Sequence, residues 1–168
     1  MKIKTLLAAV IVMFVFTTVQ AQISVSSTPV TTIRSDGITE KTGNVVLTFN
    51  SAPANGTDTI TLDYGVKVNV ATAAGAITSG TGITIGTIST SGNLVRLPLT
   101  FASAAGTNIV TLSGVRVDVA GSGLTELSAS LSSTAISIVA GQNITKVVNS
   151  IAAPMSAGKS TNAKAALL

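Results

Sequence analysis

The stretch that decides the fold is residues 59–70, TITLDYGVKVNV. Apolar side chains stand at every second position from Ile60 to Val70, and the positions between them hold Thr, Asp, Gly, Lys and Asn. Side chains of a β-strand point alternately to the two faces of a sheet, so a period of two indicates one buried and one solvent-facing side. The stretch therefore predicts a half-buried antiparallel strand or a bent pair of strands.

A second part of the chain resembles this one. Residues 47–71 read LTFNSAPANGTDTITLDYGVKVNVA, and residues 99–120 read LTFASAAGTNIVTLSGVRVDVA. The matches keep their order at offsets of 52, 50 and 49 residues. We interpret them as two repeat units, 44–92 and 93–142, with Asn143 opening an incomplete third. The period slips by one residue at Ser113-Gly114, which predicts a bulge or a tight bend there, since a one-residue slip turns side chains to the other face.

Further strands are predicted at 23–26, 30–33, 45–49, 83–88, 95–101, 127–131 and 136–139. Short turn signals separate them, including Asp36-Gly37, Asn55-Gly56 and Ser91-Gly92-Asn93. Pro98 cannot donate a ladder hydrogen bond, so we expect its strand at a sheet edge or at a bulge. Many short strands with short turns indicate an all-β fold, an antiparallel β-sandwich of about eight to ten strands.

The alternation also predicts the core. Tyr64 falls on the buried side of its strand. The inward-facing set shared by the two units is Leu47, Phe49, Ile60, Leu62, Val66, Val68, Leu97, Leu99, Phe101, Val110, Leu112, Val115 and Val117.

Met1–Ala21 has the pattern of a secretory signal peptide. Two lysines precede an apolar run at 6–16, and the segment ends Val19-Gln20-Ala21, with small residues at the positions that a cleavage site requires. The run is too short for a membrane-spanning helix, which needs about 20 residues. We expect a secreted or cell-surface chain without a transmembrane span after cleavage. Its expected parts are a signal peptide (1–21), a sandwich domain (22–153) and a tail or linker (154–168).

The composition excludes several kinds of reactive and metal-binding site. Of the 168 residues 46% are hydrophobic and 10% are charged, and there is no His, Cys or Trp. Metal sites built on imidazole or thiolate, cysteine nucleophiles and disulfides are excluded. The formal net charge of +4 comes from the two ends, because six basic residues balance six acidic ones between Gln22 and Ala153. These basic residues are scattered, so we expect no nucleic-acid partner.

Candidate sites are few. No nucleophile motif such as GxSxG or SxxK is present and the acidic residues are spread out, so we expect no enzyme, no catalytic residue and no cofactor. Asp63 and Asp118 are interpreted as solvated charges at nearly equivalent strand positions of the two units. Asn50, Asn55 and Asp58 are calcium candidates, because calcium takes carboxylate and amide oxygens. Capping of their own turn is the commoner role of such residues.

Segments 61–71 and 111–120, the two LTF strands and the signal peptide resemble secreted bacterial β-sandwich modules of the immunoglobulin-like or cohesin-like kind. The resemblance spans roughly Ile23 to Val148, and no residue role is carried over from it. It implies a non-enzymatic cell-surface module for adhesion, scaffolding or display. Its partners would be other extracellular or cell-surface proteins, or the chain itself.

Two alternatives belong to other functional classes. In the first, the chain is a self-assembling fibre subunit whose uncharged segment Gln22–Ile33 adds a strand to the open sheet edge of a neighbour. In the second, the chain is a carbohydrate-binding domain. That alternative is weakened because sugar faces usually stack on Trp or Tyr, and Tyr64, the single tyrosine, is predicted to be buried.

Overall fold

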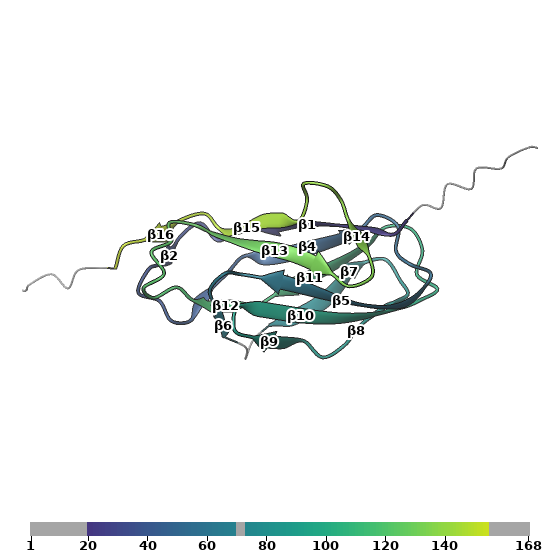
Figure 1. Ribbon diagram of the computed structural model, residues 1–168, viewed down its shortest axis with the longest axis horizontal. Coiled ribbons are helices and arrows are strands. Elements are labelled where there is room, and N and C mark those ends of the chain that lie inside the picture. The colour runs from purple at the N-terminus through teal and green to yellow at the C-terminus, as the bar shows by residue number, and fades with distance from the viewer. Residues whose placement is uncertain (1–19, 70–72, 155–168) are drawn as a thin grey trace, which may run out of the picture.

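The computed structural model describes residues 20–69 and 73–154, and they form an all-β sandwich (Figure 1). Sheet A has the strand order β14-β1-β4-β11-β7. Sheet B has the order β15-β13-β5-β10-β8, and β9 also pairs with β10. The predicted fold class is therefore confirmed.

The strands of sheet A are β1 (Gln22–Thr28), β4 (Asn44–Phe49), β7 (Ala74–Ser79), β11 (Asn108–Ser113) and β14 (Ser137–Ile138). Those of sheet B are β5 (Asn55–Asp63), β8 (Ile83–Ile85), β9 (Ser89–Ser91), β10 (Leu94–Ala102), β13 (Leu127–Ser133) and β15 (Ile144–Val148).

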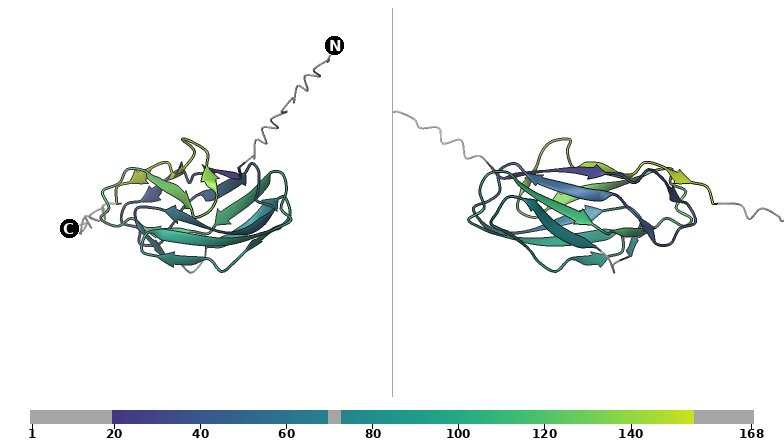
Figure 2. Two further views of the ribbon diagram at one scale, coloured as in Figure 1. Left: turned by 45° about the vertical axis from the view of Figure 1, so that its right-hand side comes forward. Right: turned by 180° about the vertical axis from the view of Figure 1, so that it is seen from behind.

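Two small sheets lie toward one end of the sandwich. The three-stranded sheet has the order β3-β12-β6, and the other pairs β16 with β2. The first described residues and the last ones lie at opposite ends of the long axis (Figures 1 and 2). The strands concerned are β2 (Ile33–Arg34), β3 (Glu40–Lys41), β6 (Lys67–Asn69), β12 (Arg116–Asp118) and β16 (Ile151–Ala152).

The core lies between sheets A and B. Every residue of the predicted inward set is buried, and so is Tyr64. At its centre Phe49 of β4 meets Phe101 of β10 edge to face, with ring centroids 5.7 Å apart. The alternation of residue types thus predicted correctly the buried side of β4, β5, β6, β10, β11 and β12.

Residues 59–69 form a bent pair, the second of the two predicted arrangements. Strand β5 runs in sheet B to Asp63, the chain turns at Gly65, and β6 continues in the three-stranded sheet. The second unit turns in the same way at Gly114, between β11 of sheet A and β12. Both glycines have positive φ angles, 66° and 72°, which side chains other than glycine rarely adopt. The bend predicted at Ser113-Gly114 is confirmed.

The two sequence-matched units contribute to both main sheets in opposite order. In the first unit β4 lies in sheet A and β5 in sheet B, whereas in the second β10 lies in sheet B and β11 in sheet A. The third strands, β6 and β12, pair with each other, and Val68 stands opposite its sequence counterpart Val117. This placement is compatible with two units related by an approximate two-fold axis, and the internal repeat itself stays a prediction.

Some local predictions are wrong. Asn55-Gly56 begins β5 instead of forming a turn. The segment after Asn143 forms β15, which pairs with β13 within this sandwich, and the incomplete third unit stays a prediction. Strand β10, which contains Pro98, has neighbours on both sides. Proline is tolerated because its backbone faces the break between β8 and β9, where the Gly86 N–H donates to the Pro98 carbonyl oxygen at 2.8 Å.

The N-terminal segment also differs from the fibre alternative. Residues Gln22–Thr28 form β1, which pairs with β4 of its own chain over six residues and buries Ile23 and Val25. The segment is therefore not free to complete a neighbour's sheet in this structure, and we do not retain that mode of assembly. Among the described residues no helix is long and apolar enough to cross a membrane. The predicted signal peptide, apart from its last two residues, and the predicted tail beyond Pro154 lie outside the described residues.

Candidate functional site

The three calcium candidates direct their contacts to different parts of the chain. Asp58 is 4% exposed and points toward the turn that follows β13. The Asn55 side-chain oxygen Oδ1 accepts from the Ser103 N–H at 3.3 Å. The Asn50 backbone N–H donates to the Gln22 carbonyl oxygen at 3.0 Å. Calcium binding by these residues stays a prediction, and in the described part of the chain no three Asp or Glu side chains gather as a metal site would require.

The Asp58 carboxylate holds the turn 133–136 to β5. Its Oδ1 accepts from the backbone N–H groups of Thr134 (2.9 Å) and Ala135 (3.1 Å) and from the Thr134 hydroxyl (2.6 Å). Its Oδ2 accepts from the Ser133 hydroxyl at 2.5 Å. Burial by itself raises the pKa of Asp58, but these hydrogen bonds outweigh it and hold the pKa below its ordinary value. A carboxylate so engaged is a structural anchor.

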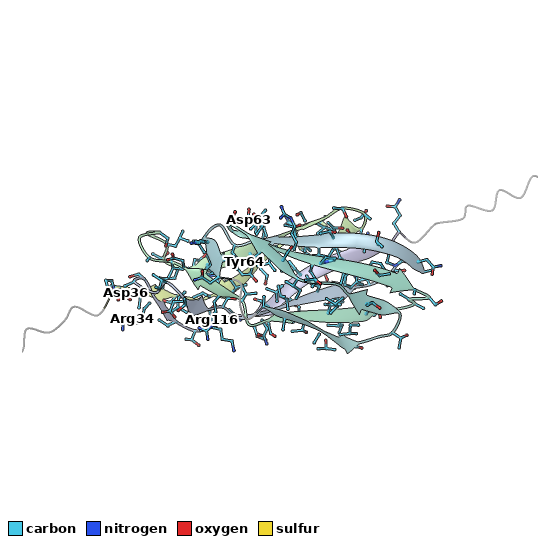
Figure 3. All side chains as sticks on the ribbon, turned by 90° about the horizontal axis from the view of Figure 1, so that it is seen from below. Arg34, Asp36, Asp63, Tyr64 and Arg116 are labelled. Atoms are coloured by element: carbon cyan, nitrogen blue, oxygen red, sulfur yellow. The ribbon has the colours of Figure 1, made fainter. Side chains whose placement is uncertain are left out.

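A shallow pocket lies on the surface of sheet B. It has a volume of about 280 Å³ and is lined by Asp63, Tyr64, Gly65, Ser128, Ser130 and Ile144. Figure 3 shows Asp63 and Tyr64 beside each other near the end of β5. The polar groups on its wall are one carboxylate and two hydroxyls, and Ile144 is 59% exposed. This lining can contact a polypeptide or a small polar group, but it brings no acid and base together.

The Asp63 carboxylate also makes hydrogen bonds that stabilise the fold. Its Oδ1 accepts from the Gly65 N–H at 2.7 Å, across the bend, and from the Asn93 side-chain amide at 2.5 Å. Asp118 lies in β12, where its Oδ1 accepts from the Ala120 N–H at 3.0 Å. The two carboxylates therefore do not occupy equivalent places: Asp63 precedes the bend of its unit and Asp118 follows it. Each caps its own turn in a different sheet.

These contacts predict a contrast between two substitutions of Asp63. Asp63→Ala removes both hydrogen bonds, and it should lower the free energy of unfolding by roughly 1–2 kcal/mol, given about 1 kcal/mol per bond. Asp63→Asn keeps an oxygen in place, so it should lose less than half as much. Chemical denaturation of both variants checks this. Equal losses would show that the negative charge, and not the acceptor, stabilises the bend.

The Tyr64 hydroxyl is the second unusual polar group near the pocket. It is buried, and no described residue makes a hydrogen bond of good geometry with it. Burial raises the pKa of Tyr64 far above its ordinary value, and the nearby Thr42 hydroxyl offsets this only in part. The ring belongs to the core, so it offers no exposed face to a ligand. Phe49 and Phe101 are also buried, which leaves the described surface without an aromatic ring for sugar stacking.

Charged side chains are distributed unevenly over the domain. The five strands of sheet A contain no Asp, Glu, Lys or Arg. Several charges gather instead near the small sheets, where Arg34 pairs with Asp36 at 2.8 Å and Arg116 Nη1 donates to the Thr39 carbonyl oxygen at 2.8 Å (Figure 3). Sequence reasoning missed this difference, because it appears only once the strands are assigned to sheets.

Comparisons with known proteins find likeness in structure alone. No protein-family model matches, and no curated protein matches. The chain is similar to a solved structure of a non-cellulosomal cohesin from the hyperthermophilic archaeon Archaeoglobus fulgidus, at 12% identity and a TM-score of 0.48, covering 76% of this chain and 92% of that one. It is also similar to BslA, a bacterial hydrophobin, at 19% identity and a TM-score of 0.32, covering 80% and 97%. The chain thus has a weak cohesin-like resemblance, at the level of the β-sandwich.

Proposed function

We propose that this chain is an exported, non-enzymatic module that acts at a cell surface through contacts with other proteins. The observation that supports it best is the state of the three strand carboxylates. Asp58, Asp63 and Asp118 each accept hydrogen bonds from nearby backbone, so each serves as a cap and none faces a second acid across a cleft. A rigid sandwich with few reactive groups suits display and binding better than catalysis.

The shape of the domain supports the same proposal. The described chain ends lie at opposite ends of the long axis, so the domain holds its two ends apart (Figure 2). The surface of sheet A is free of charge, and the pocket beside Asp63 on sheet B is shallow. Open, flat surfaces of this kind suit protein partners, whereas small ligands favour deep clefts.

Export is the part of the proposal that is tested first. When the full chain is expressed in a bacterial host, N-terminal sequencing of the secreted or surface-bound product should begin at Gln22. Ala21→Arg should block cleavage, because the residue before the cut must be small. Protease treatment of intact cells should remove the wild-type protein while a cytoplasmic marker survives. Recovery of the product from the cytoplasm with Met1 in place would contradict the proposal.

A further inference from the structure

The outer strands of the two main sheets, which are β14, β7, β15 and the short β8 and β9, differ in how well they are protected. Strand β14 has two residues and β8 has three, which limits pairing with another chain. Strand β15 carries Lys146, a charge of the kind that discourages edge-to-edge pairing. Strand β7, Ala74–Ser79, has six residues with no charge and no proline. It is the least protected edge of the described domain.

The backbone of β7 faces outward at two known positions. The carbonyl oxygen of Ile23 accepts from the Val139 N–H, on the side of β1 away from β4. The N–H and C=O groups of successive residues in a strand point alternately to its two sides. The direction found at Ile23 therefore gives the direction at each paired residue of β4, β11 and β7, through the registers of the three strand pairs. Ala76 therefore faces β11, while the N–H and C=O groups of Gly75 and Ile77 face away from the sheet. Among the described residues those groups have no hydrogen-bond partner.

The side chains leave this edge accessible. Ala76 is exposed on the outer face of sheet A, and Ile77, on the core side, is 40% exposed. The β11 register shifts after Ile77, so a bulge ends the regular part of the edge there. Such a bulge discourages the growth of long sheets, but it leaves Ala74–Ile77 regular.

We propose that β7 pairs with β7 of a second copy of this chain, antiparallel about a two-fold axis through Ala76. Gly75 of each copy then stands opposite Ile77 of the other, and each such pair exchanges two N–H···O bonds. Ala76 faces Ala76, a small side chain at the close, non-hydrogen-bonded position. The two A sheets join into one continuous sheet, and the contact closes as a dimer.

The charge distribution favours a second copy as the occupant. The described residues carry six basic and six acidic side chains, so the domain itself has no net charge that would repel a second copy. Sheet A brings no charge to the contact, which gives a charged peptide no complementary group. A second β7 supplies the same uncharged edge with matching donors and acceptors. This inference does not depend on the proposed function, since a dimer forms in solution whatever the module binds.

Sedimentation equilibrium of the chain from Gln22 to Leu168 tests the proposal. The contact is small, so we expect a weak dimer with Kd between about 10 µM and 1 mM. Ala76→Lys should raise Kd at least about tenfold, because two like charges meet at the axis. Ser26→Lys is the matched control: Ser26 is exposed in the same cross-strand row of sheet A but lies on β1, far from the edge. It should dimerise as wild type does.

A charge exchange makes the test specific. Ala76→Asp alone should also be monomeric, whereas an equimolar mixture with Ala76→Lys should dimerise again, because opposite charges then face each other. Amide hydrogen exchange gives a readout at the residues themselves: the Gly75 and Ile77 amides should become protected in concentrated wild-type protein but not in concentrated Ala76→Lys. A wild-type chain that stays monomeric at about 1 mM would overturn the proposal. So would a dimer that Ser26→Lys disrupts equally, since the sheet face and not the β7 edge would then make the contact.

Discussion

Phe101→Ala is expected to lower the free energy of unfolding by about 3–5 kcal/mol, measured by chemical denaturation. Phe101 is 3% exposed and lies between the two sheets, so truncation leaves a cavity that the surrounding strands cannot easily fill. The neighbouring Thr100 is exposed on the same strand, so Thr100→Ala is the matched control and should change stability by less than about 1 kcal/mol. If Phe101→Ala melts within a degree or two of wild type, the assignment of the inner face is wrong.

The contact with Phe49 makes this prediction sharper. The two rings meet edge to face at an interplanar angle of 68° and link β4 of sheet A to β10 of sheet B. A double-mutant cycle of Phe49→Ala and Phe101→Ala should therefore show a coupling of about 0.5–1.5 kcal/mol beyond the separate losses of buried area. Additive losses would mean that the rings fill space independently, and that the sheets are joined mainly by the aliphatic residues around them.

The sequence was sufficient to predict the inner faces of the strands, because burial depends on alternation within one short segment. Leu47 and Phe49, or Val110 and Leu112, show their orientation without any knowledge of their neighbours. The bend at Gly114 was predictable for the same reason, because the period of two is interrupted there, beside a residue that tolerates positive φ. At Gly65 the period is unbroken, so the sequence left a straight strand and a bent pair both open.

Strand pairing was not predictable in this way. Strand β7 reads AGAITS, which has small residues and no apolar alternation, and it becomes a strand through its pairing with β11. Pro98 was expected at an edge or at a bulge because a sequence cannot show that the partner strands break opposite that residue. The long-range contacts decide both cases, since the energy of a ladder depends on which strand lies alongside.

The role of Asp58 was missed for a related reason. Its oxygens appeared as calcium ligands when the loop was considered alone, but their donors lie 75 to 77 residues further along the chain. Ser133, Thr134 and Ala135 form an ordinary polar turn in the sequence. One available signal was the position of Asp58, two residues before the buried Ile60 in a strand of strict alternation, which placed a carboxylate on the inner face.

Asp58→Ala is expected to lower the free energy of unfolding by about 3–4 kcal/mol, because four donor groups of the turn 133–135 lose their acceptor and part of that turn is buried. Two neighbouring hydrogen bonds of the same turn should weaken as well. The Thr134 hydroxyl also accepts from the Thr59 N–H, and the Ser133 hydroxyl accepts from the Ile136 N–H. Hydrogen exchange should therefore show lost protection at Thr59 and Ile136 before the rest of sheet B opens.

Asp58→Asn separates the charge from the shape. The amide oxygen can still accept from Thr134 and Ala135, but the amide nitrogen donates toward the Ser133 hydroxyl, which now has no acceptor there. We expect a loss of about 1–2 kcal/mol, less than for Asp58→Ala. Equal losses in the two variants would show that the negative charge is the essential feature of the anchor.

Acid unfolding gives the second readout for Asp58. Its pKa is lowered in the folded protein, so the folded state holds its proton less tightly than the unfolded chain does. The resulting stabilisation is complete above the unfolded value, near pH 4, and is lost as the pH falls through the lower folded value. In Asp58→Asn this part of the acid sensitivity should disappear.

The pKa of Asp36 is also lowered, by its hydrogen bond with Arg34, but that pair is exposed. Asp36→Asn should therefore retain nearly the full wild-type loss below pH 4, since exposed ion pairs contribute little. A wild-type stability that stays flat from pH 5 to pH 2 would show that the turn 133–136 binds Asp58 no better than water does.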